Sequence, residues 1–139
     1  MSTLTLDNII YSYADGTSNV LNGISYDFQP GNFYAIVGQS GAGKSTLLGL
    51  LAGLDEPTGG QILFDDQNIA DRGYSYHRKH TISLVFQNYN LFPHYTVLDN
   101  ITKHLQAVMK QSIADAEKKA KILLERVRLI DYINQYPST

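Results

Sequence analysis

The chain has 139 residues, 11 basic and 13 acidic side chains, and a net charge of -2. This length allows one domain or part of one, and the lack of a basic excess argues against a general nucleic-acid binder. The absence of cysteine excludes disulfide scaffolds, cysteine zinc sites and thiol catalysis. No apolar run reaches the roughly 20 residues of a membrane helix, and the N-terminus lacks the features of a signal peptide. We therefore expect a cytoplasmic chain with no nucleic-acid partner and no direct membrane insertion.

Residues 1–30 predict antiparallel β structure. Apolar side chains alternate with polar or small ones over residues 4–8 and again over 24–28, which is typical of half-buried strands. Asp15-Gly16 and Pro30-Gly31 are turn signals that bound these strands.

The pattern then changes to that of a parallel α/β core. Residues 33–37 form a continuous apolar and aromatic run, which predicts a strand buried on both faces, and residues 82–86 predict a second buried strand. A glycine-rich turn over 38–43 leads into a leucine-rich segment, 45–52, that predicts a helix, and residues 61–65 predict a short strand.

Two helices are predicted in the last third of the chain. Thr96 has Asp99 three residues later, and Ser112 has Asp115 at the same spacing, so each pair forms an N-terminal capping signal. Apolar side chains follow both at helical spacing. Antiparallel strands, then strand–loop–helix, then helices indicate an α/β nucleotide-binding plan.

The most specific motif is Gly38-Gln39-Ser40-Gly41-Ala42-Gly43-Lys44-Ser45, which fits G-x-x-x-x-G-K-[ST]. Its glycines let backbone N–H groups point inward as a nest for anions, at the positive end of the following helix. Lys44 can reach the β- and γ-phosphates, the Ser45 hydroxyl can ligate Mg²⁺, and Thr46 can hydrogen-bond a phosphate oxygen. We refer to residues 38–46 as the phosphate loop.

The wider pattern resembles the nucleotide-binding domain of the ATP-binding cassette family over essentially the whole chain. The segments that carry the resemblance are residues 10–13, 38–48, 53–62, 85–87 and 91–101. It implies an α/β P-loop NTPase core with an N-terminal antiparallel β subdomain, in an incomplete form without the C-terminal strands. Its parts would be 1–30 (antiparallel β), 31–87 (core to the Q-loop) and 88–139 (start of the helical subdomain).

The resemblance also implies roles for individual residues. Tyr13 would stack on adenine, with Tyr11 as the alternative. Gln87, in a segment that resembles the Q-loop, would ligate Mg²⁺ or position the attacking water. Lys44 and Gln87 would be the catalytic residues. The remaining nucleotide contacts would come from Gly38, Ser40, Gly41, Ala42, Gly43, Ser45 and Thr46, with Ser45 and Gln87 as the metal ligands.

The implied function is that of the ATP-binding subunit of a transporter. Such a subunit pairs with a second nucleotide-binding domain and couples ATP hydrolysis to movements of transmembrane partners, at the inner face of the cell membrane. The segments 54–60 and 86–91 look most like those of export-type transporters for peptides, lipoproteins or drugs. Two alternatives remain: a soluble ATPase of the same family in translation or DNA repair, and a non-hydrolytic regulatory module.

Several of the family's catalytic elements have no counterpart in this sequence. There is no Leu-Ser-Gly-Gly-Gln-type signature loop, no apolar strand ending in Asp-Glu after Gln87, and no later switch histidine. Residues 136–139 resemble the lead-in to the signature loop. We therefore expect an N-terminal fragment that binds nucleotide, hydrolyses it poorly because a water-activating group is lacking, and is unstable or aggregates by itself.

Other titratable residues receive plainer interpretations. Arg72 and the run His77 to His80 form a small basic cluster, which is typical of a solvated face. Asp65 is interpreted as a turn residue rather than a Mg²⁺ ligand. The histidines lack metal-ligand spacing with carboxylates, so no zinc site is predicted.

Overall fold

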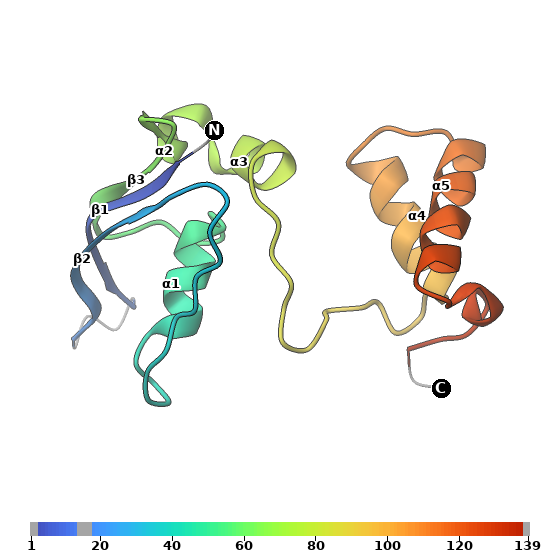
Figure 1. Ribbon diagram of the computed structural model, residues 1–139, viewed down its shortest axis with the longest axis horizontal. Helices are drawn as coiled ribbons and strands as arrows, with labels where there is room; N and C mark the ends of the chain where they lie inside the picture. The colour runs from blue at the N-terminus through green and yellow to red at the C-terminus, as the bar shows by residue number, and fades with distance from the viewer. Residues whose placement is uncertain (1–2, 14–17, 138–139) are drawn as a thin grey trace. The chain divides into compact units, whose positions relative to one another are not determined.

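The structure, a computed structural model, describes residues 3–13 and 18–137 and divides into two compact units, Met1–Leu84 and Val85–Thr139 (Figure 1). The turn predicted at Asp15-Gly16 lies outside the described residues.

The first unit is built on a four-stranded antiparallel sheet. Its strands are β1 (Leu4–Ser12), β2 (Asn19–Phe28), β3 (Gly59–Phe64) and β4 (Gln67–Asn68), in the spatial order β2-β1-β3-β4. The strands predicted near residues 4–8, 24–28 and 61–65 are thereby confirmed. β1 is a central strand of the sheet, paired over most of its length with β2 on one side and with β3 on the other.

Helix α1 (Lys44–Leu51) covers one face of this sheet and confirms the predicted leucine-rich helix. Leu50 is completely buried and shares a core with Ile9 of β1, which is also completely buried, and with Ile62 of β3. The other members of this core are Leu6, Tyr11, Leu21, Leu47, Leu51 and Ile69. Burying these side chains supplies the main force that holds α1, and with it the phosphate loop, against the sheet.

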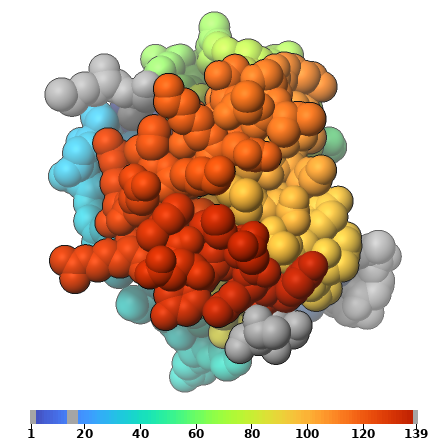
Figure 2. All heavy atoms as spheres, turned by 90° about the vertical axis from the view of Figure 1, so that its right-hand side faces the viewer, coloured from blue at the N-terminus to red at the C-terminus, as the bar shows by residue number. Residues whose placement is uncertain are grey.

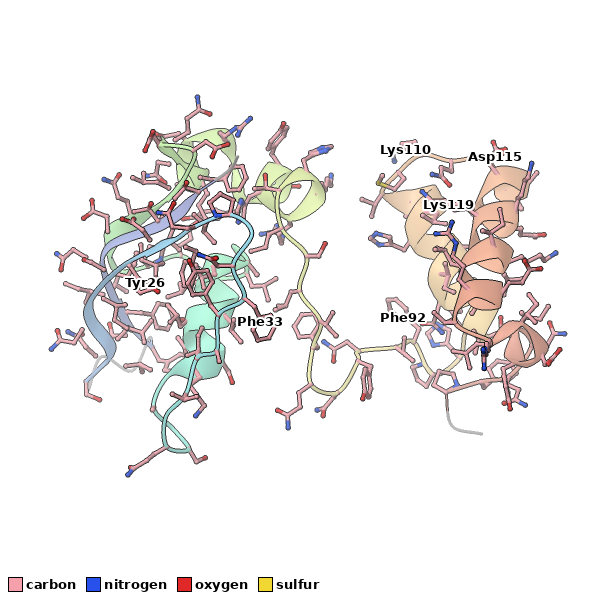
Figure 3. All side chains as sticks on the ribbon, in the orientation of Figure 1. Tyr26, Phe33, Phe92, Lys110, Asp115 and Lys119 are labelled. Atoms are coloured by element: carbon pink, nitrogen blue, oxygen red, sulfur yellow. The ribbon has the colours of Figure 1, made fainter. Side chains whose placement is uncertain are left out.

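The two buried strands predicted over 33–37 and 82–86 are wrong for this structure. Both segments run as irregular chain, and Phe33 (Figure 3), Val37 and Val85 are 97%, 86% and 83% exposed. A strand needs hydrogen-bonding neighbours, and within the described part of the chain neither segment has a paired strand. Two residues of segment 31–37 do pack: Ile36 lies against the hydrophobic core, and Tyr34 lies edge-on to Phe28 and to Tyr26, which is labelled in Figure 3.

Two short helices that the sequence did not predict follow the sheet. α2 (Ile69–Arg72) is capped by Asn68, and α3 (Tyr74–His80) begins directly after Gly73. Before them Asp65 lies in the tight turn between β3 and β4, as predicted, and its carboxylate accepts a hydrogen bond from the Thr3 N–H at 2.8 Å.

The second unit consists of α4 (Val97–Ala107), α5 (Ile113–Arg126) and the 3-10 turn η1 (Ile130–Tyr132). In Figure 2 the side chains of α4 and α5 form one continuous surface. Ala116, Ala120 and Leu124 are the buried positions of α5 and pack at helical spacing. Together with the sheet and helices of the first unit, this makes the chain an α/β protein. Over residues 3–13 and 18–137, no helix is both long enough and apolar enough to cross a bilayer.

Both predicted caps form. Thr96 and Asp99 make a reciprocal capping box at the start of α4, and the Ser112 hydroxyl accepts a hydrogen bond from the Asp115 N–H at the start of α5. The hydrogen bonds that Asp99 accepts from Thr96 hold the pKa of its carboxyl below the ordinary 3.8.

This lowered pKa predicts a pH-dependent stability. Because the folded pKa of Asp99 lies below the unfolded one, its stabilisation is complete above pH 3.8 and disappears as pH falls through the folded value. Urea unfolding followed by circular dichroism is expected to show the native chain more stable than the Asp99→Asn variant at pH 6, with the gap closing in acid. A gap that stays constant down to pH 2 would contradict this role.

Candidate functional site

The phosphate loop joins the irregular segment after β2 to the first turn of α1. Gly41 and Gly43 both adopt left-handed backbone conformations with φ of 82°, and the Ala42 N–H donates to the Gln39 carbonyl at 3.2 Å. The loop therefore curls back on itself before α1 begins. Glycine accepts this conformation with little strain, whereas other residues pay for it.

Gly43 is also required by packing. A Cβ placed there would lie 2.9 Å from Leu21 Cδ2 and 3.2 Å from Val20 Cγ1, both on β2. The loop thus presses directly on the sheet at the point where α1 starts. This close approach fixes the start of α1 relative to the core.

The ammonium group of Lys44 lies over the loop. Its Nζ donates to the carbonyls of Gly38 at 2.9 Å and Gln39 at 2.7 Å. These contacts place a positive charge inside the curl of the loop, beside the first turn of α1. An ammonium group held there can exchange loop carbonyls for the oxygens of an anion.

The first turn of α1 supplies donors of its own. The first N–H groups of a helix have no intrahelical acceptor, and among the described residues no side chain caps this end of α1. No acidic side chain lies in that turn, so the positive end of the helix dipole is left uncompensated. Ser45 is exposed and Thr46 is half-buried, so hydroxyl groups also lie within this first turn. The arrangement is suited to phosphate groups.

Tyr13 reaches the same turn from the end of β1. Its hydroxyl lies 2.9 Å from the Thr46 hydroxyl, and its ring meets that of Tyr11 edge-on at 5.3 Å. Tyr13 is 52% exposed, whereas Tyr11 is only 9% exposed. A base can stack on an exposed ring, so this difference favours Tyr13 over Tyr11 as the adenine contact. The Tyr13–Thr46 hydrogen bond joins that ring to the phosphate loop, a contact between residues 33 positions apart that no local sequence pattern predicts.

Gln87 lies in the second unit, in the turn just after Val85 and Phe86, and its side chain is exposed. The phosphate loop, α1 and Tyr13 lie in the first unit. Tyr13 and residues 38–46, which were predicted to contact nucleotide, therefore lie together in the first unit. Gln87 belongs to the other unit.

Arg72, Arg78, Lys79 and His80 are exposed, as expected for a solvated face, and only His77 of this basic cluster departs from that interpretation. His77 is 2% exposed, and its Nε2 donates to the Leu51 carbonyl at 2.9 Å. Arg78 donates to the Gly53 carbonyl. The basic character of the run suggested that the whole helix is exposed, although its His77 face is buried. The spacing of Tyr74 and His77, three residues apart on one helical face, was the available signal.

Comparison with known proteins gives a consistent result. The family model described as ABC transporter matches residues 21–139. The spermidine/putrescine import ATP-binding protein PotA of Nitrosomonas eutropha is 39% identical over 99% of this chain and 36% of its own length. An uncharacterised ABC transporter ATP-binding protein of Mycobacterium tuberculosis, Rv0986, is 38% identical over 95% of this chain and 55% of its own length. The chain therefore spans about a third of the length of the first relative and just over half of the length of the second.

Solved structures agree with this family. The dimeric structure of MJ0796, described as a bacterial ABC transporter cassette, matches with a TM-score of 0.83 and 30% identity over 97% of this chain and 62% of that one. A post-hydrolysis state of MJ0796 bound to ADP and Pi matches with a TM-score of 0.79 and 29% identity over the same shares of the two chains. The structure of cbiO1 from Clostridium perfringens, described as part of the ABC transporter complex cbiONQ, matches with a TM-score of 0.76 and 30% identity over 96% of this chain and 53% of that one. The chain belongs to the ABC transporter family.

Proposed function

We propose that this chain forms the nucleotide-binding part of an ABC transporter subunit, which couples ATP binding and hydrolysis to transport. The observation that carries the proposal is the phosphate loop with the Lys44 ammonium over it, at the uncapped start of α1. Backbone donors, a helix N-terminus and one ammonium group converge there, which is the donor set that a triphosphate needs.

In this proposal the loop holds the phosphates and Tyr13 holds the base. Lys44 binds the β- and γ-phosphates and stabilises the charge that develops on them during transfer. Thr46 offers its hydroxyl to a phosphate oxygen. The backbone contacts come from Gly38, Ser40, Gly41, Ala42 and Gly43.

Mg²⁺ is the metal that fits this donor set. The exposed Ser45 hydroxyl, in the first turn of α1, is an oxygen ligand of the kind that Mg²⁺ takes beside substrate phosphates. The Gln87 carbonyl oxygen is the second proposed ligand and would also orient the attacking water. Bound at these residues, Mg²⁺ would neutralise phosphate charge.

Hydrolysis and transport are proposed for the complete transporter. MJ0796 is described as a dimeric cassette, and cbiO1 as part of a transporter complex. We propose that the subunit pairs with a second nucleotide-binding domain and attaches to transmembrane partners at the inner face of the membrane.

The expected export direction gains no support. One of the relatives is named as a spermidine/putrescine import protein, so the segments 54–60 and 86–91 are no guide to direction. We therefore propose ATP-coupled transport without assigning a direction or a cargo.

Isothermal calorimetry with ATP, ADP and AMP in the presence of Mg²⁺ tests the nucleotide site. Because the proposed contacts are concentrated on the β- and γ-phosphates, we expect affinity to fall from ATP to AMP by about tenfold or more. Equal affinity for ATP and AMP would contradict the assignment of the loop to the terminal phosphates.

Tyr13 gives a separate prediction for the base. The Tyr13→Ala variant is expected to bind MgATP about twofold to tenfold more weakly, since it loses aromatic stacking. Tyr13→Phe keeps the ring and loses only the hydroxyl that contacts Thr46, so it should retain most of the affinity. If both variants bind like the native chain in calorimetry, adenine lies elsewhere.

A further inference from the structure

Two consecutive side chains of α3 bind the C-terminal end of α1. The His77 Nε2 donates to the Leu51 carbonyl at 2.9 Å, and the Arg78 guanidinium donates to the Gly53 carbonyl. The ring of His77 also lies near Phe64 of β3, with centroids 6.3 Å apart. One short helix thus contacts both the sheet and the end of α1.

The C-terminal end of α1 has no charged cap of its own. The carbonyls of its last turn accept backbone N–H groups in part: Ala52 donates to Leu48, Gly53 to Leu50, and Leu54 to Gly49. No basic residue lies in that turn, although a cation there would offset the negative end of the helix dipole. His77 and Arg78 donate to the carbonyls of Leu51 and Gly53, and the Arg78 guanidinium provides that cation from another helix.

The contact is closely packed. Gly53 has φ of +67°, and a Cβ at this position would lie 3.1 Å from Tyr74 Cδ1 and 3.4 Å from His77 Cδ2. His77 is only 2% exposed. A buried hydrogen bond to a carbonyl is costly to leave unmade, so α3 cannot move from this end of α1 without a penalty.

The other end of the same helix begins at Lys44. α1 has eight residues, so its ends are about 12 Å apart, and a helix this short transmits a shift along its axis as a rigid body. A displacement of the Leu51 end therefore moves the first turn, where Lys44, Ser45 and Thr46 lie.

We propose that His77 and Arg78 are positioning residues for nucleotide binding. They fix the axial position of α1 from its C-terminal end, and Arg78 compensates the negative end of the dipole whose positive end faces the phosphates. This inference rests on the proposed nucleotide site and adds residues that lie outside the phosphate loop.

Four variants of the full chain test this role. Arg78→Gln removes the guanidinium charge and Arg78→Lys keeps a positive charge. His77→Leu removes the donor to Leu51, and His77→Gln keeps an N–H donor on a neutral side chain. Lys79→Gln is the matched control: it makes the same charge change on the same helix, and within the described part of the chain the Lys79 side chain has no hydrogen bond or ion pair. Each variant is measured for MgATP affinity by calorimetry, at a temperature where thermal melts show it fully folded.

The proposal predicts that Arg78→Gln and His77→Leu bind MgATP about threefold to tenfold more weakly while folded. Arg78→Lys and His77→Gln should recover most of this loss, and Lys79→Gln should bind like the native chain. If Arg78→Gln and His77→Leu only lower the melting temperature and bind MgATP normally, the contact is structural and the proposal fails. If the native chain itself binds no MgATP, the proposed function fails, and this inference fails with it.

Discussion

Replacing Lys44 by alanine is expected to weaken MgATP binding by about a hundredfold or more, the equivalent of two charge-assisted hydrogen bonds. The ammonium group is held over the loop by the carbonyls of Gly38 and Gln39, so it is already in place before a nucleotide arrives. The loss should be largest for ATP and smallest for AMP, because Lys44 is assigned to the terminal phosphates.

The fold should tolerate this substitution. Lys44 begins α1 but is not part of the buried core, and alanine is a favourable helix residue. A melting temperature close to that of the native chain would show that lost binding reflects the site. Lys79→Ala removes the same charge from an exposed position and serves as the control. Unchanged ATP affinity in Lys44→Ala, measured by calorimetry, would remove the phosphate loop as the binding site.

Replacing Gly60 by alanine is expected to be the most damaging single-methyl change in the first unit. Gly60 is the second residue of β3, beside β1, with φ of +78°, and a Cβ there would lie 2.2 Å from the Asn8 carbonyl oxygen and 2.4 Å from that of Asp7. These neighbours are backbone atoms of the central strand, so they cannot rotate away. Left-handed strain and overpacking together predict a loss of about 3–5 kcal/mol in unfolding free energy.

Gly31→Ala is the matched control for this prediction. Gly31 also has a left-handed conformation, with φ of +79°, but nothing lies within 4 Å of a Cβ placed there. Gly31→Ala should lower the unfolding free energy by about 1–2 kcal/mol, from backbone strain alone. Urea unfolding of the two variants separates strain from collision, and similar losses in both would contradict the close packing of β3 on β1.

Local signals in the sequence predicted much of the fold. The capping pairs Thr96–Asp99 and Ser112–Asp115 marked where α4 and α5 begin, because a helix N-terminus is recognised by its own first turn. The motif over residues 38–46 likewise predicted a turn before α1. These features need only neighbouring residues to form.

Features that depend on distant partners were predicted poorly. The apolar runs 33–37 and 82–86 fit buried strands, but a pattern of apolar residues does not specify which strand pairs with them, and Phe33 and Val37 remain exposed. The prediction for His77 was wrong in the opposite sense: its place in a basic run suggested an exposed side chain, yet a hydrogen bond to the Leu51 carbonyl makes burial of the ring acceptable. Both cases depend on which chain segments meet.

An amide NMR titration of the chain with MgATP shows whether nucleotide binds at the phosphate loop. The largest chemical-shift changes are expected on residues 38–46, with a further response at Tyr13. Shift changes that are absent, or that cluster away from both segments, would contradict the assignment of this loop as the nucleotide site.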